Sequence, residues 1–214
     1  MDTLNIPAGY RIERGLLWPA DDSACAAVVF DTTGDADQAI NLCKNKGLAI
    51  QAGGNCGVWA LHFASKFDRV VTFEPDPVNF RALVWNTSSA ENILSLPCAL
   101  GKHGGEWCDM DREPGNAGAH QVRAGNVAPV VSIDGLALTE CDLIYLDIEG
   151  SEMDAIFGAA KTIDQFRPII AVEDKGLSRR YGFQKEEIVK HLALAHGYRV
   201  SARPNRDVIM VPND

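Results

Sequence analysis

Residues 48–75 read LAIQAGGNCGVWALHFASKFDRVVTFEP, and this stretch decides the fold. The apolar run 48–50 predicts a short buried strand, and the β-rich run 70–73 predicts a second one. Between them, apolar residues at helical spacing over 58–64 predict a helix. The loop before this helix contains the residues that tolerate backbone conformations which a Cβ would block: Gly53, Gly54 and Gly57. Strand, glycine loop, helix and strand together predict a βαβ unit of the kind that binds a nucleotide.

The alternation of helices and strands continues through the rest of the chain. The predicted helices are 34–46, 77–86, 151–165 and 185–195. The predicted strands are 92–97, 107–110, 143–147 and 169–172, followed by a closing antiparallel hairpin of 198–202 and 207–211. We therefore expect an α/β fold with a Rossmann-like, doubly wound, mostly parallel sheet of seven strands. Residues 34–214 would form this domain, and residues 1–33, with a short strand at 25–30, an N-terminal cap segment.

The composition limits the class of protein. Apolar residues make up 46% of the 214, enough for a full core, and six cysteines without a C-x-x-C pair argue against zinc and disulfides. The sequence shows no apolar run of membrane-spanning length, so we expect a cytoplasmic protein without a membrane partner. A net charge of −9 disfavours non-specific nucleic-acid binding. A local basic groove stays open as an alternative because arginines cluster late in the chain: Arg179, Arg180, Arg199, Arg203 and Arg206.

The glycine loop fits neither of the two common phosphate-binding motifs. Started at Gly53 or at Gly54, the pattern G-x-G-x-x-G finds no glycine at its second and third positions. No Gly-Lys-Ser/Thr follows the loop, which excludes a P-loop. The loop offers instead a close backbone approach at Gly53 and a helix N-terminus that favours a carboxylate.

Several short motifs, taken in order, resemble one enzyme family. They are A-G-G-N-C-G (52–57), F-E-P-D-P (73–77), L-V-W-N (83–86), C-A-L-G (98–101), Y-L-D-I-E-G-S-E (145–152) and F-R-P-I-I-A-V-E (166–173). Together they resemble the FkbM-type members of the class I S-adenosylmethionine-dependent methyltransferases. The resemblance implies that residues 34–214 are a class I methyltransferase domain. It also implies S-adenosylmethionine as the cofactor and S-adenosylhomocysteine as its product.

The resemblance implies a role for each residue of the cofactor site. Glu74 would accept hydrogen bonds from both ribose hydroxyls. Asp147 is expected beside the transferred methyl group for a separate reason, its place at the carboxyl end of a strand. The residues implied along the adenine are Pro75, Ala99 and Leu100. Those implied in the loop under the methionine part are Gly53, Asn55 and Gly57, and Gly54 between them is a further expected cofactor-binding residue. Gln51 stands where the family usually has an acidic residue, so it would accept a hydrogen bond from the cofactor's amino group without the charge attraction.

An aliphatic hydroxyl must lose its proton during methyl transfer, which requires a positioned base or a metal. Carboxylates at the carboxyl ends of the strands are the candidates: Asp147 first, then Glu149 and Glu173, with Glu152 as a further one. Glu149 has an alternative role as a helix cap, and Glu173 as a simple strand-end acid. A divalent cation held by Asp147 and Glu173 is conceivable, but the resemblance requires no metal.

The glycine-rich stretch 101–127 predicts a functional loop, in which His103 and His120 are candidate substrate contacts. The family resemblance favours an O-methyltransferase whose partner is the hydroxyl of a sugar, glycan or small metabolite. One alternative is a 2′-O-methyltransferase acting on RNA or a nucleotide, with Lys175 as the lysine near a strand end. Another is a cofactor-binding module that lacks catalysis. After the fourth strand the chain has Asp147-Ile-Glu-Gly rather than the Asn/Asp-Pro-Pro-Tyr of amine methyltransferases.

Overall fold

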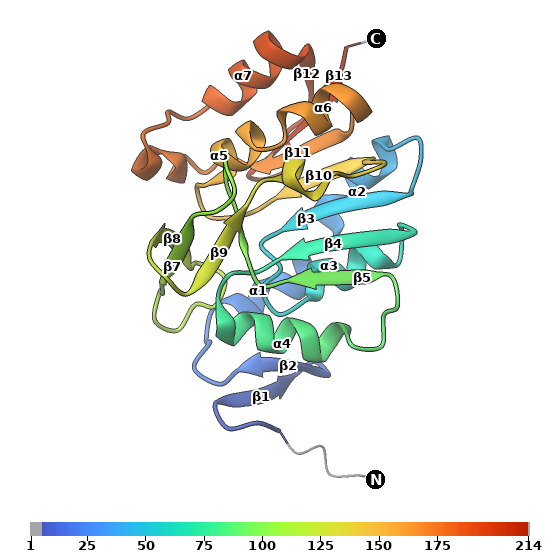
Figure 1. Cartoon of the computed structure of the whole chain (residues 1–214). Helices are drawn as coiled ribbons and strands as arrows, with labels where there is room; N and C mark the ends of the chain where they lie inside the picture. The colour runs from blue at the N-terminus through green and yellow to red at the C-terminus, as the bar shows by residue number, and fades with distance from the viewer. Residues whose placement is uncertain (1–5, 214) are drawn as a thin grey trace.

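A computed structural model describes residues 6–213 and places a seven-stranded sheet at the centre of the molecule (Figure 1). In spatial order its strands are β12 (Tyr198–Ala202), β13 (Asp207–Pro212), β11 (Ile169–Glu173), β10 (Leu143–Leu146), β3 (Leu48–Ala52), β4 (Arg69–Phe73) and β5 (Ile93–Leu96). The pairs from β11 to β5 are parallel, whereas β13 pairs antiparallel with both β11 and β12. The predicted mostly parallel α/β sheet is confirmed. Its strand order reverses between β3 and β10, where open sheets bind ligands.

Helices cover both faces of the sheet because residues along each strand alternate between two hydrophobic cores. In β3, Leu48, Ile50 and Ala52 belong to the core shared with α5, α6 and α7, whereas Ala49 belongs to the core shared with α2 and α3. These helices are α2 (Gly34–Leu42), α3 (Val58–Ala64), α5 (Glu152–Phe157), α6 (Ala160–Phe166) and α7 (Glu187–His196). No helix in residues 6–213 combines the length and apolar character needed to cross a membrane.

Residues 10–19 form a hairpin beside α4 (Pro77–Thr87), at the end of the molecule opposite α7 (Figure 1). The hairpin consists of β1 (Tyr10–Glu13) and β2 (Leu16–Pro19), and α1 (Cys25–Thr32) follows it. The strand predicted at 25–30 is therefore wrong. The Asp22 carboxylate accepts hydrogen bonds from the backbone N–H groups of Cys25 and Ala26, which satisfies donors at the start of a helix.

The stretch between β5 and β10 builds a second, four-stranded sheet. In spatial order its strands are β6 (Ala99–Leu100), β9 (Ala128–Val131), β7 (Trp107–Asp111) and β8 (Gln121–Ala124). The strand predicted at 107–110 is confirmed as β7. Two single turns of 3₁₀ helix complete the elements, η1 (Ile133–Leu136) and η2 (Leu177–Tyr181).

The single helix predicted over 151–165 is wrong, because two helices, α5 and α6, occupy this segment. The interruption lies at Gly158, where a Cβ would come within 2.1 Å of the carbonyl oxygen of Gly101. The carbonyl of Gly158 also accepts the backbone N–H of Asp134 at 2.8 Å. Contacts with segments distant in sequence therefore break a helix that its own apolar pattern would continue.

Candidate active site

A cavity opens at the carboxyl ends of β3, β4 and β10, with about 810 Å³ of empty space that continues into solvent. Most of the predicted site residues line it: Gln51, Gly53, Asn55, Glu74, Pro75, Ala99, Leu100, Asp147 and Glu149. His120 lines it as well, whereas Gly54, Gly57, His103 and Glu173 lie outside this lining.

Glu74 lies directly after β4, and 5% of its surface is exposed. Its two carboxylate oxygens accept the backbone N–H groups of Asn55 at 2.7 Å and of Asp76 at 2.9 Å. Burial raises the pKa of Glu74 to about 7, although these two hydrogen bonds act in the opposite direction. Each oxygen keeps a free lone pair, so the carboxylate can still accept two hydroxyl donors from a bound molecule.

The three glycines of the loop have different roles. Gly53 has a φ of +87°, and a Cβ there would lie 2.0 Å from the carbonyl oxygen of Asp147, so only glycine fits. Gly54 and Gly57 face α4 instead of the cavity. A Cβ on Gly54 would lie 2.9 Å from Leu83, and one on Gly57 would lie 3.2 Å from it. These two glycines therefore allow α4 to pack closely against the loop, which differs from their expected place under a ligand.

Gln51 connects the glycine loop to two strands. Its Nε2 donates a hydrogen bond to the carbonyl of Gly53 at 2.9 Å, and its Oε1 accepts one from the hydroxyl of Thr72 in β4. Both ends of the amide are thus engaged within the protein. The side-chain carbonyl keeps one lone pair that a ligand amino group could use.

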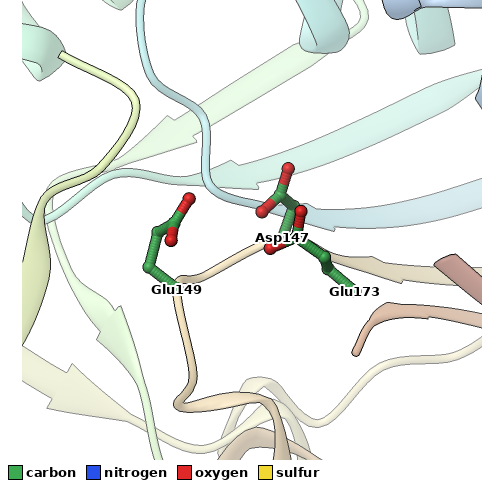
Figure 2. A group of neighbouring side chains, drawn as sticks. All are labelled: Asp147, Glu149 and Glu173. Atoms are coloured by element: carbon green, nitrogen blue, oxygen red, sulfur yellow. The ribbon is translucent and has the colours of Figure 1, made fainter. Parts of the chain in front are cut away.

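Three carboxyl groups meet beside the cavity, at the ends of β10 and β11 (Figure 2). Asp147, Glu149 and Glu173 each offer an oxygen, and these oxygens lie within 4.8 Å of one another. The Nζ of Lys175 lies 3.3 Å from Glu149 Oε1 and 2.5 Å from Glu173 Oε1. Such a group could hold a divalent cation, but Lys175 already supplies a positive charge to two of its members. Asp147 Oδ1 is buried and lacks a hydrogen-bond partner among residues 6–213.

The same arrangement shifts the protonation of the two glutamates. Burial and the nearby charge of Asp147 raise the pKa of both Glu149 and Glu173, whereas Lys175 acts to lower it. Burial alone would lower the pKa of Lys175, but its three acidic neighbours raise it above its ordinary value. The group is therefore able to hold a proton among its carboxyl groups while Lys175 stays charged.

Glu152, expected as a further catalytic candidate, has a structural role instead. Its carboxylate accepts the backbone N–H groups of Ile148 at 3.0 Å and Gly150 at 3.2 Å, and it does not line the cavity. Burial raises its pKa to about 7. The alternative role of Glu149 as a helix cap is wrong, because its side chain turns to Lys175 and Glu152 holds this loop.

The family model described as the methyltransferase FkbM domain matches residues 51–200 of the chain. The chain belongs to the FkbM methyltransferase family. The resemblance predicted from the motifs is thereby confirmed. No curated protein matches the chain.

Solved structures agree with this FkbM fold. An FkbM methyltransferase from Methylobacillus flagellatus KT is 20% identical, with a TM-score of 0.52, over 78% of this chain and 43% of that one. The present chain thus spans less than half the length of that protein. A precorrin-6y C5,15-methyltransferase from Geobacter metallireducens GS-15 is 10% identical, with a TM-score of 0.52, over 96% and 98% of the two chains. At these identities the likeness concerns the fold alone.

The FkbM match begins at residue 51, yet earlier residues also line the cavity, namely Cys25 and Val29 of α1. The second sheet contributes Met110 and Val122 to the same lining. Sequence reasoning expected a cap from residues 1–33 but did not single out these side chains. Whether Cys25 and Val29 reach the cavity depends on how α1 packs against the rest of the molecule. The apolar pattern of so short a helix does not identify the segment that it packs against.

Ala117, in the glycine-rich stretch 101–127, is hydrogen-bonded to three other segments around the cavity. Its backbone N–H donates to the Asp22 carboxylate at 2.9 Å. Its carbonyl accepts the side-chain amides of Asn55 and Asn79, both at 2.8 Å. One residue of the glycine-rich stretch is therefore bound by the N-terminal segment, the glycine loop and α4 together.

Asp76 is a residue of the site that sequence reasoning missed. It is fully buried, and its carboxylate accepts the backbone N–H groups of Val78 and Asn79 at the start of α4. The Nε of Arg112 lies 2.6 Å from Asp76 Oδ2, and the Nδ1 of His120 lies 3.0 Å from the same oxygen. Burial acts to raise its pKa, but hydrogen bonds from His120, Arg112 and the helix outweigh burial and lower it. The Asp-Pro pair was a usable signal for a helix cap. No signal in the sequence near Asp76 indicated that Arg112 and His120, from the 101–127 stretch, would bind its carboxylate.

Proposed function

We propose that the chain is an S-adenosylmethionine-dependent O-methyltransferase that transfers a methyl group to a hydroxyl of a sugar, glycan or small metabolite. One observation carries the proposal. In a chain of the FkbM family, the cavity brings together Glu74, after β4, and the Asp147–Glu149 pair, after β10. The first suits a ribose diol, and the second suits the removal of a hydroxyl proton.

The residues present fit the cofactor. The buried Glu74 carboxylate offers two acceptor oxygens to the ribose, and Ala99 and Leu100 give an apolar wall suited to adenine. Gly53 allows the loop to touch the end of β10 without a side chain between them. Bound S-adenosylmethionine would supply a sulfonium methyl group, whose carbon–sulfur bond breaks as the acceptor oxygen bonds to the methyl carbon.

We assign the removal of the acceptor proton to Asp147. Its Oδ1 is buried beside the cavity and has no hydrogen-bond partner in the part of the chain that the structure describes, so a hydroxyl placed there would donate to it and then transfer its proton. Glu149 lines the cavity next to it and is the second candidate base. Glu173 does not line the cavity. It binds Lys175, and Lys175 in turn would position Glu149 and balance the negative charge of Glu149.

The wall beside this acid group suits an acceptor with an apolar face. The rings of Trp59 and Tyr145 stack with centroids 5.2 Å apart, and both residues line the cavity. Tyr145 is buried against Trp59, so the ring of Trp59 is the aromatic face that can bind the flat apolar side of a ring-shaped molecule, while a nearby carboxylate can bind a hydroxyl. Lys175, the lysine that the RNA alternative requires, is instead bound to Glu149 and Glu173. A small-molecule or glycan acceptor is therefore the partner we propose. We place the reaction in the cytoplasm as part of the same proposal.

Calorimetry with S-adenosylmethionine and S-adenosylhomocysteine tests the proposal directly. We expect both to bind, and the absence of binding by the unmodified protein would refute the assignment. A screen of sugars, glycans and short RNAs with isotopically labelled cofactor then tests the acceptor. Label transferred to RNA but to no sugar or metabolite would favour the 2′-O alternative, and binding without transfer to any class would favour a catalytically inactive module.

A further inference from the structure

Asn79, in the first turn of α4, has an unsatisfied polar atom at the cavity. The residue is 1% exposed and lines the cavity. Its Nδ2 donates a hydrogen bond to the carbonyl of Ala117, but its Oδ1 is buried and has no partner within residues 6–213. A buried carbonyl without a donor costs free energy, so its presence calls for an explanation.

The hydrogen bond to Ala117 determines which way the amide of Asn79 points. Exchanging its oxygen and nitrogen would place two carbonyl oxygens against each other, at the present separation of 2.8 Å. The free atom is therefore an oxygen, which can only accept. A molecule that satisfies it must bring a donor, a hydroxyl or an N–H group.

Two short chains of hydrogen bonds place Asn79 on the side of the cavity that holds Glu74. The Ala117 carbonyl that binds Asn79 also binds the side chain of Asn55, whose backbone N–H donates to Glu74. Asp76 accepts the backbone N–H of Asn79 at 3.3 Å, and its own backbone N–H donates to Glu74 at 2.9 Å. Asp147 Oδ1, the other buried atom without a partner in the described residues, belongs to the acid group instead.

We propose that Asn79 is a further cofactor-binding residue, whose Oδ1 accepts a hydrogen bond from one ribose hydroxyl while Glu74 accepts one from the other, in place of the expected contact of Glu74 with both. This inference rests on the proposed function, because it takes the bound molecule to be the adenosyl cofactor. A ribose diol has two donors, and an amide oxygen beside a carboxylate provides two acceptors of different chemistry. The amide does not titrate, so this contact persists at pH values where Glu74 is protonated.

The test compares two asparagines on the same helix. Asn79→Leu removes the acceptor but leaves Ala117 bound to Asn55, so the wall of the cavity keeps an anchor. Asn86→Leu is the matched control. Asn86 lies seven positions further along α4 and also donates its amide to backbone carbonyls, those of Leu17 and Cys56, but it does not line the cavity. Calorimetry would give the Kd of S-adenosylhomocysteine and of its 2′-deoxy and 3′-deoxy forms for each protein.

We expect Asn79→Leu to weaken binding of S-adenosylhomocysteine roughly tenfold and Asn86→Leu to leave it unchanged. One of the two deoxy ligands should bind the unmodified protein and Asn79→Leu equally well, because the hydroxyl that Asn79 holds is missing. Unchanged affinity in Asn79→Leu would overturn the inference, as would an equal loss for all three ligands. If the unmodified protein binds none of them, the proposed function itself fails, which is a separate outcome.

Discussion

The buried carboxyl group of Glu74 makes cofactor affinity depend on pH. Its pKa is raised to about 7, and hydroxyl donors bind the ionised form more strongly than the neutral one. Between pH 6 and pH 8 the ionised fraction rises from about one tenth to about nine tenths. We therefore expect S-adenosylhomocysteine to bind about tenfold more tightly at pH 8 than at pH 6. Binding at pH 7 should release about half a proton.

Calorimetry in buffers of different ionisation enthalpy measures both quantities. Glu74→Gln should abolish the proton release and flatten the pH dependence, while Glu74→Ala should weaken affinity at least about tenfold through the loss of charged hydrogen bonds. Glu152 also has a pKa of about 7, but it lies outside the cavity lining, so the Glu74 variants separate the two groups. A Kd that stays constant from pH 6 to pH 8, or proton release that persists in Glu74→Gln, would refute the reasoning.

Three further predictions concern other parts of the site. Asp147→Asn should lower turnover on the true acceptor at least about 100-fold while the Kd for S-adenosylhomocysteine stays within about threefold; full activity would exclude Asp147 as the base. Gly53→Ala should abolish cofactor binding in calorimetry, since its Cβ would lie 2.0 Å from a carbonyl oxygen, and tight binding would contradict that contact. Asp76→Ala should lower the free energy of unfolding, measured with urea, by about 2–4 kcal/mol, because it removes a helix cap and leaves Arg112 and His120 without their buried partner. A loss below about 0.5 kcal/mol would show that neither contact stabilises the fold.

Residues 48–75 identified the ligand-binding half of the molecule because their information is local. Apolar periodicity distinguishes strand from helix over a few residues, and closely spaced glycines between a strand and a helix indicate a loop whose backbone a Cβ would obstruct. Glu74 followed from its position after a strand, since parallel strands present their carboxyl ends at one edge of the sheet. These local signals, with the order of the motifs, were enough for the sheet and the family. The division at residue 33 and the roles of the individual site residues stay predictions.

Contacts between distant segments decided the rest. The backbone N–H of Ala117 donates to the Asp22 carboxylate at the start of α1, where local composition predicted a strand, and the carbonyl of Gly101 approaches Gly158 where periodicity predicted an unbroken helix. The partners of Asp76 and the pairing of Lys175 with two glutamates likewise join residues from separate elements.

The sequence by itself therefore determined the alternating helices and strands, the glycine loop and the acidic residues at the strand ends. Only the tertiary structure decided which of those acids face the cavity, which are bound by Lys175 or by backbone N–H groups, and which oxygen atoms lack a donor among residues 6–213. The physical reason is that a side chain's type and spacing specify what it can bind, whereas its actual partner depends on packing between segments far apart in the chain.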